Sequence, residues 1–98
     1  DVPILRFPTQ PGFKIPQTGW NSLSDMKSVL CEGLPEEPYV YYNHSFYAPL
    51  SPYTVAQTDY ILPYSAMLQK DNFHACQFHS EISGNIGQQI LENFLRLS

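Results

Sequence analysis

Residues 73–81 read Phe-His-Ala-Cys-Gln-Phe-His-Ser-Glu, and this stretch carries the most information in the chain. Alternate residues of a β-strand share a face, so an extended conformation places His79 on the side opposite Cys76. We expect His79 at the end of this strand, where the chain turns toward a helix that begins near Gly84. If the chain stays extended as far as Glu81, the carboxylate lies on the same side as the imidazole. Such a carboxylate can accept the proton of one ring nitrogen and leave the other nitrogen free as a base.

Purely structural interpretations of the same residues are also consistent with the sequence. A histidine at a strand end is often structural or solvated, and a His-x-Glu pair alone is a weak signal. Cys76 is predicted to be a small buried hydrophobic residue, and Cys31, with no histidine near it in sequence, to be structural. His74 and His79 are expected on opposite faces of the strand. Because the chain also lacks a Cys-x-x-Cys or His-x-x-x-His pair, no metal site is predicted.

Outward from this stretch, the sequence predicts a hairpin before it and a helix after it. Residues 65–70 and 73–79 form the predicted hairpin, with a turn over residues 70–72. Residues 84–97 have apolar side chains at helical spacing. The apolar stripe of this helix consists of Ile86, Ile90, Phe94 and Leu97, widened by Leu91 and Leu95.

The remaining elements are short. Strands are predicted over residues 4–7, 39–47 and 53–60, and a short helix capped by Ser24 is predicted over residues 25–31. The pattern indicates an α/β fold of mostly short strands in a mixed sheet, closed by a C-terminal amphipathic helix. One helix cannot cover both faces of a sheet, which suggests that the chain is part of a larger fold.

Composition narrows the range of functions. Ninety-eight residues suffice for one small domain, which we place over residues 1–98. The net charge is −4 and no run of lysines or arginines exists, so nucleic acid is not an expected partner. Apolar stretches are too short for a membrane span, and the N-terminus does not resemble a secretory signal. Two cysteines make no disulfide framework, so we expect a reducing, cytoplasmic location.

Two further segments mix polar and aromatic residues. Residues 42–47 read Tyr-Asn-His-Ser-Phe-Tyr, so polar residues interrupt an aromatic strand. This is either a strand end with turn-forming residues or a shelf whose backbone groups bind the polar ends of a small ligand. Residues 16–21 read Pro-Gln-Thr-Gly-Trp-Asn and include the single tryptophan. Trp20 is either a core residue beside a turn or the anchor of a protein interface.

In this order and spacing, these segments resemble the class I (triad) glutamine amidotransferases, and in particular the glutaminase subunits of imidazole glycerol phosphate synthase. The Gln-Phe-His-x-Glu element is shared by the whole class, whereas Gly-Trp-Asn and His-Ser-aromatic-Tyr narrow the resemblance to this subunit. The resemblance spans residues 4–97. The matching segments are residues 15–21, 44–47, 57–60, 77–84 and 91–94.

The resemblance implies the C-terminal half of a flavodoxin-like amidotransferase fold, with no cofactor and no metal. It assigns the general base to His79 and the orienting carboxylate to Glu81. Backbone contacts to the substrate glutamine are assigned to Ser45 and Phe46. The face toward a partner cyclase, a (β/α)₈ barrel that receives ammonia, is assigned to Trp20, Asn21 and Tyr47.

Three departures from the family pattern matter. Ser80 replaces the usual proline, and Ile82 replaces a lysine on the ammonia-gate side of the interface. No Gly-x-Cys-x-Gly-like element is present, so we expect the N-terminal half of the same subunit to supply the nucleophile and this chain alone to be inactive. The alternatives are a glutaminase that supplies ammonia for surface-sugar amidination, a non-catalytic aromatic-rich binding module, and a catalytically dead relative.

Overall fold

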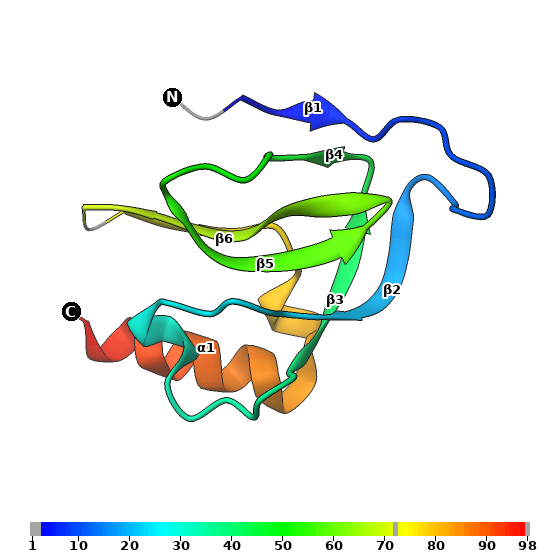
Figure 1. Cartoon of the computed structure of the whole chain (residues 1–98). Helices are drawn as coiled ribbons and strands as arrows, with labels where there is room; N and C mark the ends of the chain where they lie inside the picture. Colours follow the sequence, from blue (N-terminus) through cyan, green and yellow to red (C-terminus); the bar gives the residue numbers. More distant parts are fainter. Residues whose placement is uncertain (1–2, 72, 98) are drawn as a thin grey trace.

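The protein is described here by a computed structural model that covers residues 3–71 and 73–97 (Figure 1). Short strands separated by loops make up the first three quarters of the chain and the longest helix comes last, with α1 at the opposite end of the molecule from β1 and β4. The elements are β1 (Leu5–Arg6), β2 (Gln17–Ser22), the 3₁₀ turn η1 (Val29–Cys31), β3 (Tyr39–His44), β4 (Phe46–Tyr47), β5 (Thr54–Tyr60), β6 (Leu62–Lys70), β7 (Phe73–Cys76), the 3₁₀ turn η2 (Ser80–Ile82) and α1 (Gly84–Arg96).

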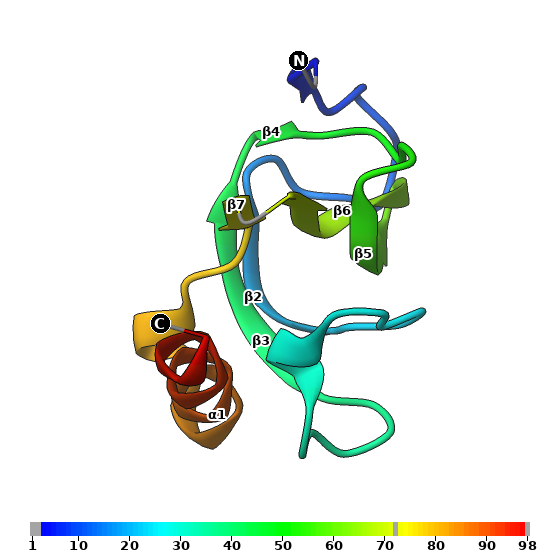
Figure 2. The ribbon, with the colours of Figure 1, turned by 90° about the vertical axis from the view of Figure 1, so that its left-hand side faces the viewer.

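The described strands pair in three small antiparallel sheets. β1 pairs with β4, β2 pairs with β3, and β5, β6 and β7 follow one another in the third sheet. Figure 2 shows β2 and β3 running side by side along a common curve. The predicted hairpin is present as β6 and β7, although β7 ends at Cys76 and residue 72 of the predicted turn lies outside the described residues. The predicted strand over 39–47 is divided at Ser45 into β3 and β4.

Aromatic rings fill the space between these sheets. Phe7 is buried and its ring stacks on Tyr47 with centroids 5.0 Å apart. Tyr42 of β3 and Tyr64 of β6 are fully buried and meet edge to face at 5.9 Å. Their hydroxyls are satisfied inside the protein, Tyr42 with Thr58 Oγ1 at 2.6 Å and Tyr64 by donating to a glutamine side chain at 2.7 Å. Burial raises the pKa of both phenols, so they stay neutral donors that fix the relative position of the sheets.

The predicted helix over residues 25–31 is wrong for most of its length. Ser24 does not cap a helix, because its backbone exchanges hydrogen bonds with Gln57 of β5 at 2.8 and 2.9 Å and its hydroxyl donates to the same carbonyl. Asp25 adopts a positive φ of 50°, which ends any helical path. Only η1 is helical, and Ser28 caps it through a hydrogen bond from Leu30 N.

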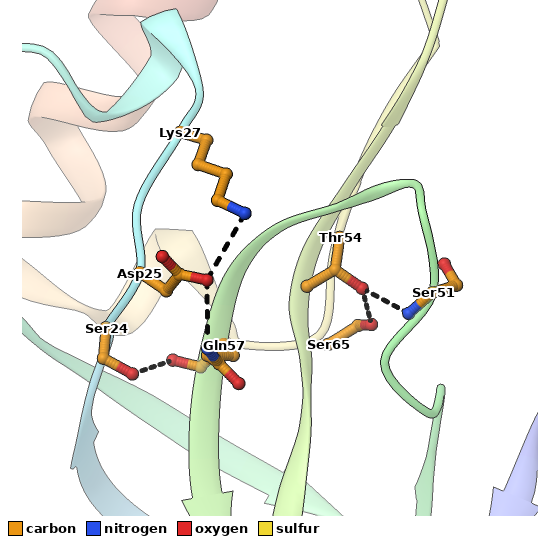
Figure 3. A network of polar contacts seen from close by, with 7 residues as sticks. All are labelled: Ser24, Asp25, Lys27, Ser51, Thr54, Gln57 and Ser65. Atoms are coloured by element: carbon orange, nitrogen blue, oxygen red, sulfur yellow. Dashed lines mark hydrogen bonds and ion pairs between the residues drawn. The ribbon is translucent and has the colours of Figure 1, made fainter.

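A polar network along β5 holds residues 24–27 against that strand instead of in a helix (Figure 3). The Asp25 carboxylate accepts from the Gln57 side chain at 3.2 Å and lies 3.4 Å from Lys27 Nζ. On the β6 side, Thr54 Oγ1 and Ser65 Oγ are 2.6 Å apart, and Thr54 also accepts from a loop N–H. The bonds of Ser24 and Asp25 to Gln57 are long-range, so no local capping signal in the sequence reports them.

Helix α1 matches its predicted range but buries a narrower face than predicted. Ile90 is buried and Ile86 is partly buried, whereas the other apolar residues of the predicted stripe are exposed. Gly87 and Asn93 complete the buried face, and Asn93 Nδ2 donates to the carbonyls of Leu30 and Glu32, both at 2.8 Å. The exposed apolar residues of α1 are Leu91, Phe94, Leu95 and Leu97.

Within the described residues, no helix has both the length and the apolar character needed to cross a membrane.

Candidate active site

His79 and Glu81 form a hydrogen-bonded pair at the surface. His79 Nδ1 lies 3.1 Å from Glu81 Oε2, and the side chains are 41% and 69% exposed. A carboxylate only accepts, so Nδ1 carries the proton and Nε2 of the neutral ring keeps its lone pair for a reacting group. The pair is too exposed to contribute much stability, and its effect is to orient the imidazole.

The geometry arises from a turn and not from an extended chain, which corrects the route by which the sequence predicted it. β7 ends at Cys76, three residues before His79, and Glu81 lies in the 3₁₀ turn η2. The tight turn folds the Glu81 carboxylate back onto the imidazole of His79, the residue that precedes the turn. The spacing of two residues therefore brings the groups together, as predicted, by a different backbone conformation.

The backbone of this turn is fixed from two sides. His79 N donates to the Tyr41 carbonyl of β3 at 2.9 Å. Ser83, which is fully buried, donates from Oγ to the His79 carbonyl at 2.6 Å and accepts from Tyr41 N at 2.9 Å. The sequence analysis did not single out Ser83, because a serine just before a glycine reads as an ordinary helix cap.

Electrostatics keep the carboxylate of the pair ionised. The pKa of Glu81 is held below its usual value, first by a hydrogen bond from its own backbone N–H. Desolvation opposes this shift, and the hydrogen bond and charge of His79 lower the pKa further. The ionised form is the one that accepts the imidazole proton and stabilises an imidazolium. The pair thus has the geometry that the base and the orienting group of a nucleophilic triad require.

Gly87 allows α1 to pack directly against the turn that carries His79 and Glu81. A Cβ at this position would overlap the carbonyl oxygen of Ser80 and would lie 2.8 Å from its carbonyl carbon. Both are backbone atoms, so a side chain cannot be accommodated by a rotamer change. Gly87 was not identified from the sequence, because a glycine inside a helical pattern gives no sign of a close backbone contact.

We expect Gly87→Ala to push α1 away from the turn that carries His79 and Glu81. Overpacking of this kind typically costs about 1–3 kcal/mol, and the displaced turn should also lower kcat. Denaturant unfolding of the chain would measure the first effect. Steady-state assays of the chain joined to an N-terminal half of the kind that the resemblance implies would measure the second. Gln88→Ala, an exposed change on the same helix, should alter stability by less than about 0.5 kcal/mol. Equal behaviour of the two variants would contradict the packing argument.

Neither cysteine of the chain is placed to act as the nucleophile. Cys76 Sγ faces the Phe78 carbonyl at 3.7 Å, and Cys31 Sγ lies 3.8 Å from Met67 Sδ. Desolvation raises the pKa of both thiols, and the charge of Glu81 raises that of Cys76 further. The sequence prediction that Cys76 is buried is wrong, since the residue is exposed at the end of β7, whereas Cys31 is half-buried.

Ser45, which separates β3 from β4, and Phe46, the first residue of β4, form a short stretch that we call the ledge. The Ser45 carbonyl accepts from Phe7 N at 3.0 Å, and Phe46 is opposite Arg6 in the β1–β4 pair. The Phe46 side chain is 52% exposed. His44, the residue before the ledge, lies beneath it with Nδ1 2.7 Å from the Phe46 carbonyl oxygen.

The three residues assigned to a partner face are in different environments. Trp20 is 55% exposed on β2, and its ring meets that of Tyr41 edge to face. Asn21 is half-buried, and its Nδ2 donates to the Asp59 carbonyl at 3.0 Å. Tyr47 is buried in the aromatic core, so its ring does not lie on the exposed surface that carries Trp20.

Among residues 3–71 and 73–97, no group of three or more His, Cys, Asp or Glu side chains is arranged to hold a metal ion.

One known protein family matches most of the chain. Residues 8–97 match the family described as "Glutamine amidotransferase class-I". The chain belongs to the class I glutamine amidotransferase family. This result agrees with the resemblance predicted from residues 77–84 and the segments around it.

Within this family, the chain is similar to curated proteins that are named as subunits of one enzyme. The chain is 51% identical, over 99% of its length, to the imidazole glycerol phosphate synthase subunit HisH of Bacteroides thetaiotaomicron, of which it covers 50%. It is 44% identical, over 88% of its length, to the subunit of the same name from Colwellia psychrerythraea, of which it covers 39%. The chain therefore spans about half the length of the curated relatives it matches.

A solved structure confirms the fold. A protein from Thermoplasma acidophilum, described as a subunit of GMP synthase, superimposes with a TM-score of 0.74 at 22% identity, over 98% of this chain and 48% of that one. The predicted α/β amidotransferase fold, with short strands and a C-terminal helix, is thus confirmed.

Proposed function

We propose that this chain supplies the base and the orienting carboxylate of a glutaminase, the amidotransferase subunit of an imidazole glycerol phosphate synthase. The observation that carries the proposal is the pair of His79 Nδ1 and Glu81 Oε2 at 3.1 Å, with the ring half-exposed, in a chain of the class I family. The relatives named for this synthase favour histidine biosynthesis over surface-sugar amidination. A catalytic pair of this kind also argues against a purely non-catalytic binding module.

The nucleophile in this proposal is a cysteine of the N-terminal half of the same subunit. Two features of the chain support a docked second half. The first is an apolar groove between β6, β7 and α1, where the buried Nδ1 of His74 has no hydrogen-bond partner. The second is the exposed apolar side of α1. The groove is lined in part by Leu30, Met67, Cys76, Ile90, Leu91 and Phe94.

The reaction follows from the free nitrogen of His79. Nε2 takes the proton of the cysteine thiol, and the thiolate attacks the side-chain amide carbon of glutamine. The resulting imidazolium, stabilised by Glu81, returns the proton to the departing ammonia. Water then attacks the thioester with His79 as base and releases glutamate. Ser45 and Phe46 contribute backbone groups that hold the substrate.

The ammonia acceptor in this proposal is a (β/α)₈-barrel cyclase that docks on the surface around Trp20 and Asn21. An exposed tryptophan on a rigid strand is a typical anchor of a protein interface. Ile82, 51% exposed beside the catalytic pair, is an apolar residue at the position where the family pattern has a lysine. Contacts on that side of the interface are therefore expected to be apolar and not ionic.

The test joins this chain to the N-terminal half of the Bacteroides thetaiotaomicron relative, a protein that we call the reconstituted subunit, and adds the cyclase of that organism. We expect glutamine to support cyclase product formation. Trp20→Ala should weaken the complex about tenfold or more, without changing the reaction driven by ammonium salts. Leu50→Ala, another exposed apolar residue but on neither β2 nor β3, is the control.

Two other results would reject parts of the proposal. Glutaminase activity with no glutamine-dependent cyclase product would reject the cyclase as acceptor and favour another acceptor such as a surface sugar. A reconstituted subunit without any glutaminase activity would reject the catalytic assignment and favour a binding module or a dead relative.

A further inference from the structure

His44 occupies a position that the proposed reaction does not yet use. Its ring is half-buried among Phe7, Tyr42 and Tyr64, with centroids 5.1, 5.2 and 5.3 Å away. Nδ1 lies 2.7 Å from the Phe46 carbonyl oxygen. Nε2 lies 2.8 Å from Gln17 Oε1 and 3.2 Å from the Tyr64 hydroxyl. Both ring nitrogens are therefore engaged, which fixes the orientation of the imidazole.

The fixed His44 ring helps to set the direction of the backbone groups of Phe46. The C=O and N–H of one peptide group point in opposite directions. Since the Ser45 carbonyl accepts from Phe7 N at 3.0 Å, the N–H of Phe46 points away from β1. In an extended chain the C=O of Phe46 faces that same side, where it meets the His44 ring. The Phe46 N–H is thus a donor whose direction is set by Phe7 on one side and by His44 on the other.

The protonation state of His44 suits this role. A carbonyl only accepts, so Nδ1 must carry a proton. Burial lowers the pKa of His44, the bond to the Phe46 carbonyl opposes this shift, and the charge of His79 lowers the pKa further. The Nδ1–H bond to the Phe46 carbonyl does not depend on whether Nε2 also carries a proton.

We propose that His44 is a positioning residue for glutamine, which holds the Phe46 peptide so that its N–H meets an acceptor oxygen of the substrate. The inference rests on the proposed function, because it takes the ledge to be part of the glutamine site. His44 does not touch the reacting atoms in this arrangement. Its loss should therefore weaken substrate binding more than it slows the chemical step.

Two substitutions separate the two nitrogens of the ring. In His44→Asn, the side-chain Nδ2 lies near the place of the histidine Nδ1 and can still donate to the Phe46 carbonyl. In His44→Gln, the longer side chain reaches toward Gln17 and Tyr64, and the bond to Phe46 is lost. In the reconstituted subunit we expect His44→Gln to raise the KM for glutamine about tenfold, with a smaller change in kcat. We expect His44→Asn to keep KM within about threefold.

The outcomes separate this inference from the proposed function. If the unsubstituted protein is active and both variants raise KM equally, or His44→Gln leaves KM unchanged, the positioning role is overturned. If His44→Gln does not fold, as judged by its unfolding transition, a tenfold rise of KM in His44→Asn alone still overturns it. If the unsubstituted protein is inactive toward glutamine, the proposed function fails and this inference fails with it.

Discussion

Replacing His79 with alanine in the reconstituted subunit should lower kcat for glutamine hydrolysis by about 10⁴-fold or more. Without the imidazole, the pair loses the group that takes the thiol proton and returns it to ammonia, and Glu81 has no ring to orient. The side chain is 41% exposed and its main partner is exposed as well, so stability should change by less than about 0.5 kcal/mol. Steady-state ammonia release and denaturant unfolding measure the two quantities.

The contrast between activity and stability is what makes this variant informative. A parallel loss of stability and activity would indicate that His79 acts through the fold. A kcat within tenfold of the unsubstituted protein would show that another group is the base, and the catalytic assignment of the pair would be withdrawn. Activity driven by ammonium salts at the cyclase should be unchanged, because that reaction bypasses glutamine.

The 98-residue chain alone should hydrolyse glutamine no faster than the buffer does. Its two thiols are directed at other partners and have raised pKa values, so neither of them is placed to attack a substrate beside His79 Nε2. Joining the N-terminal half should increase the rate by about 10⁴-fold or more. The measurement is ammonia release by equal concentrations of the chain with and without the added half.

The isolated chain should also differ in its physical behaviour. The apolar groove beside β7 and the exposed leucines of α1 would face water, so we expect a broad unfolding transition and binding of an apolar dye. A sharp, cooperative transition of a monomer, or glutaminase activity at a family-like rate, would contradict the need for a second half.

The sequence predicted best those elements that depend on residues close together in the chain. The range of α1 and the hairpin of β6 and β7 followed from periodicity and turn residues. The helix predicted over 25–31 failed because β5 provides backbone partners for Ser24 and Lys27 that lie about thirty residues away in sequence. The buried face of α1 was misjudged for a related reason. Side-chain hydrophobicity favoured Phe94 and Leu97, whereas close packing at Gly87 and the hydrogen bonds of Asn93 decide which side faces inward.

The candidate site was predictable in part. A spacing of two residues was enough to pair His79 with Glu81, because both an extended chain and a tight turn bring such residues together. The role of Ser83 could not be predicted, since it depends on a hydrogen bond to Tyr41, forty-two residues earlier. The orientation of His44 likewise depends on contacts with Gln17 and Tyr64, which only the folded sheets bring to the ring.

The contact between Gly87 and the Ser80 carbonyl has a consequence for how such proteins diverge. Gly87 of α1 lies directly against the backbone of Ser80, in the turn that carries the proposed base. Substitutions in the helix therefore constrain substitutions in the turn, and the reverse also holds. A lineage that acquires a side chain at position 87 must displace the turn that carries His79 and Glu81, and so loses stability unless that turn also changes. The sequence of α1 is in this way coupled to the geometry of the proposed catalytic pair, although the helix contributes no side chain to that pair.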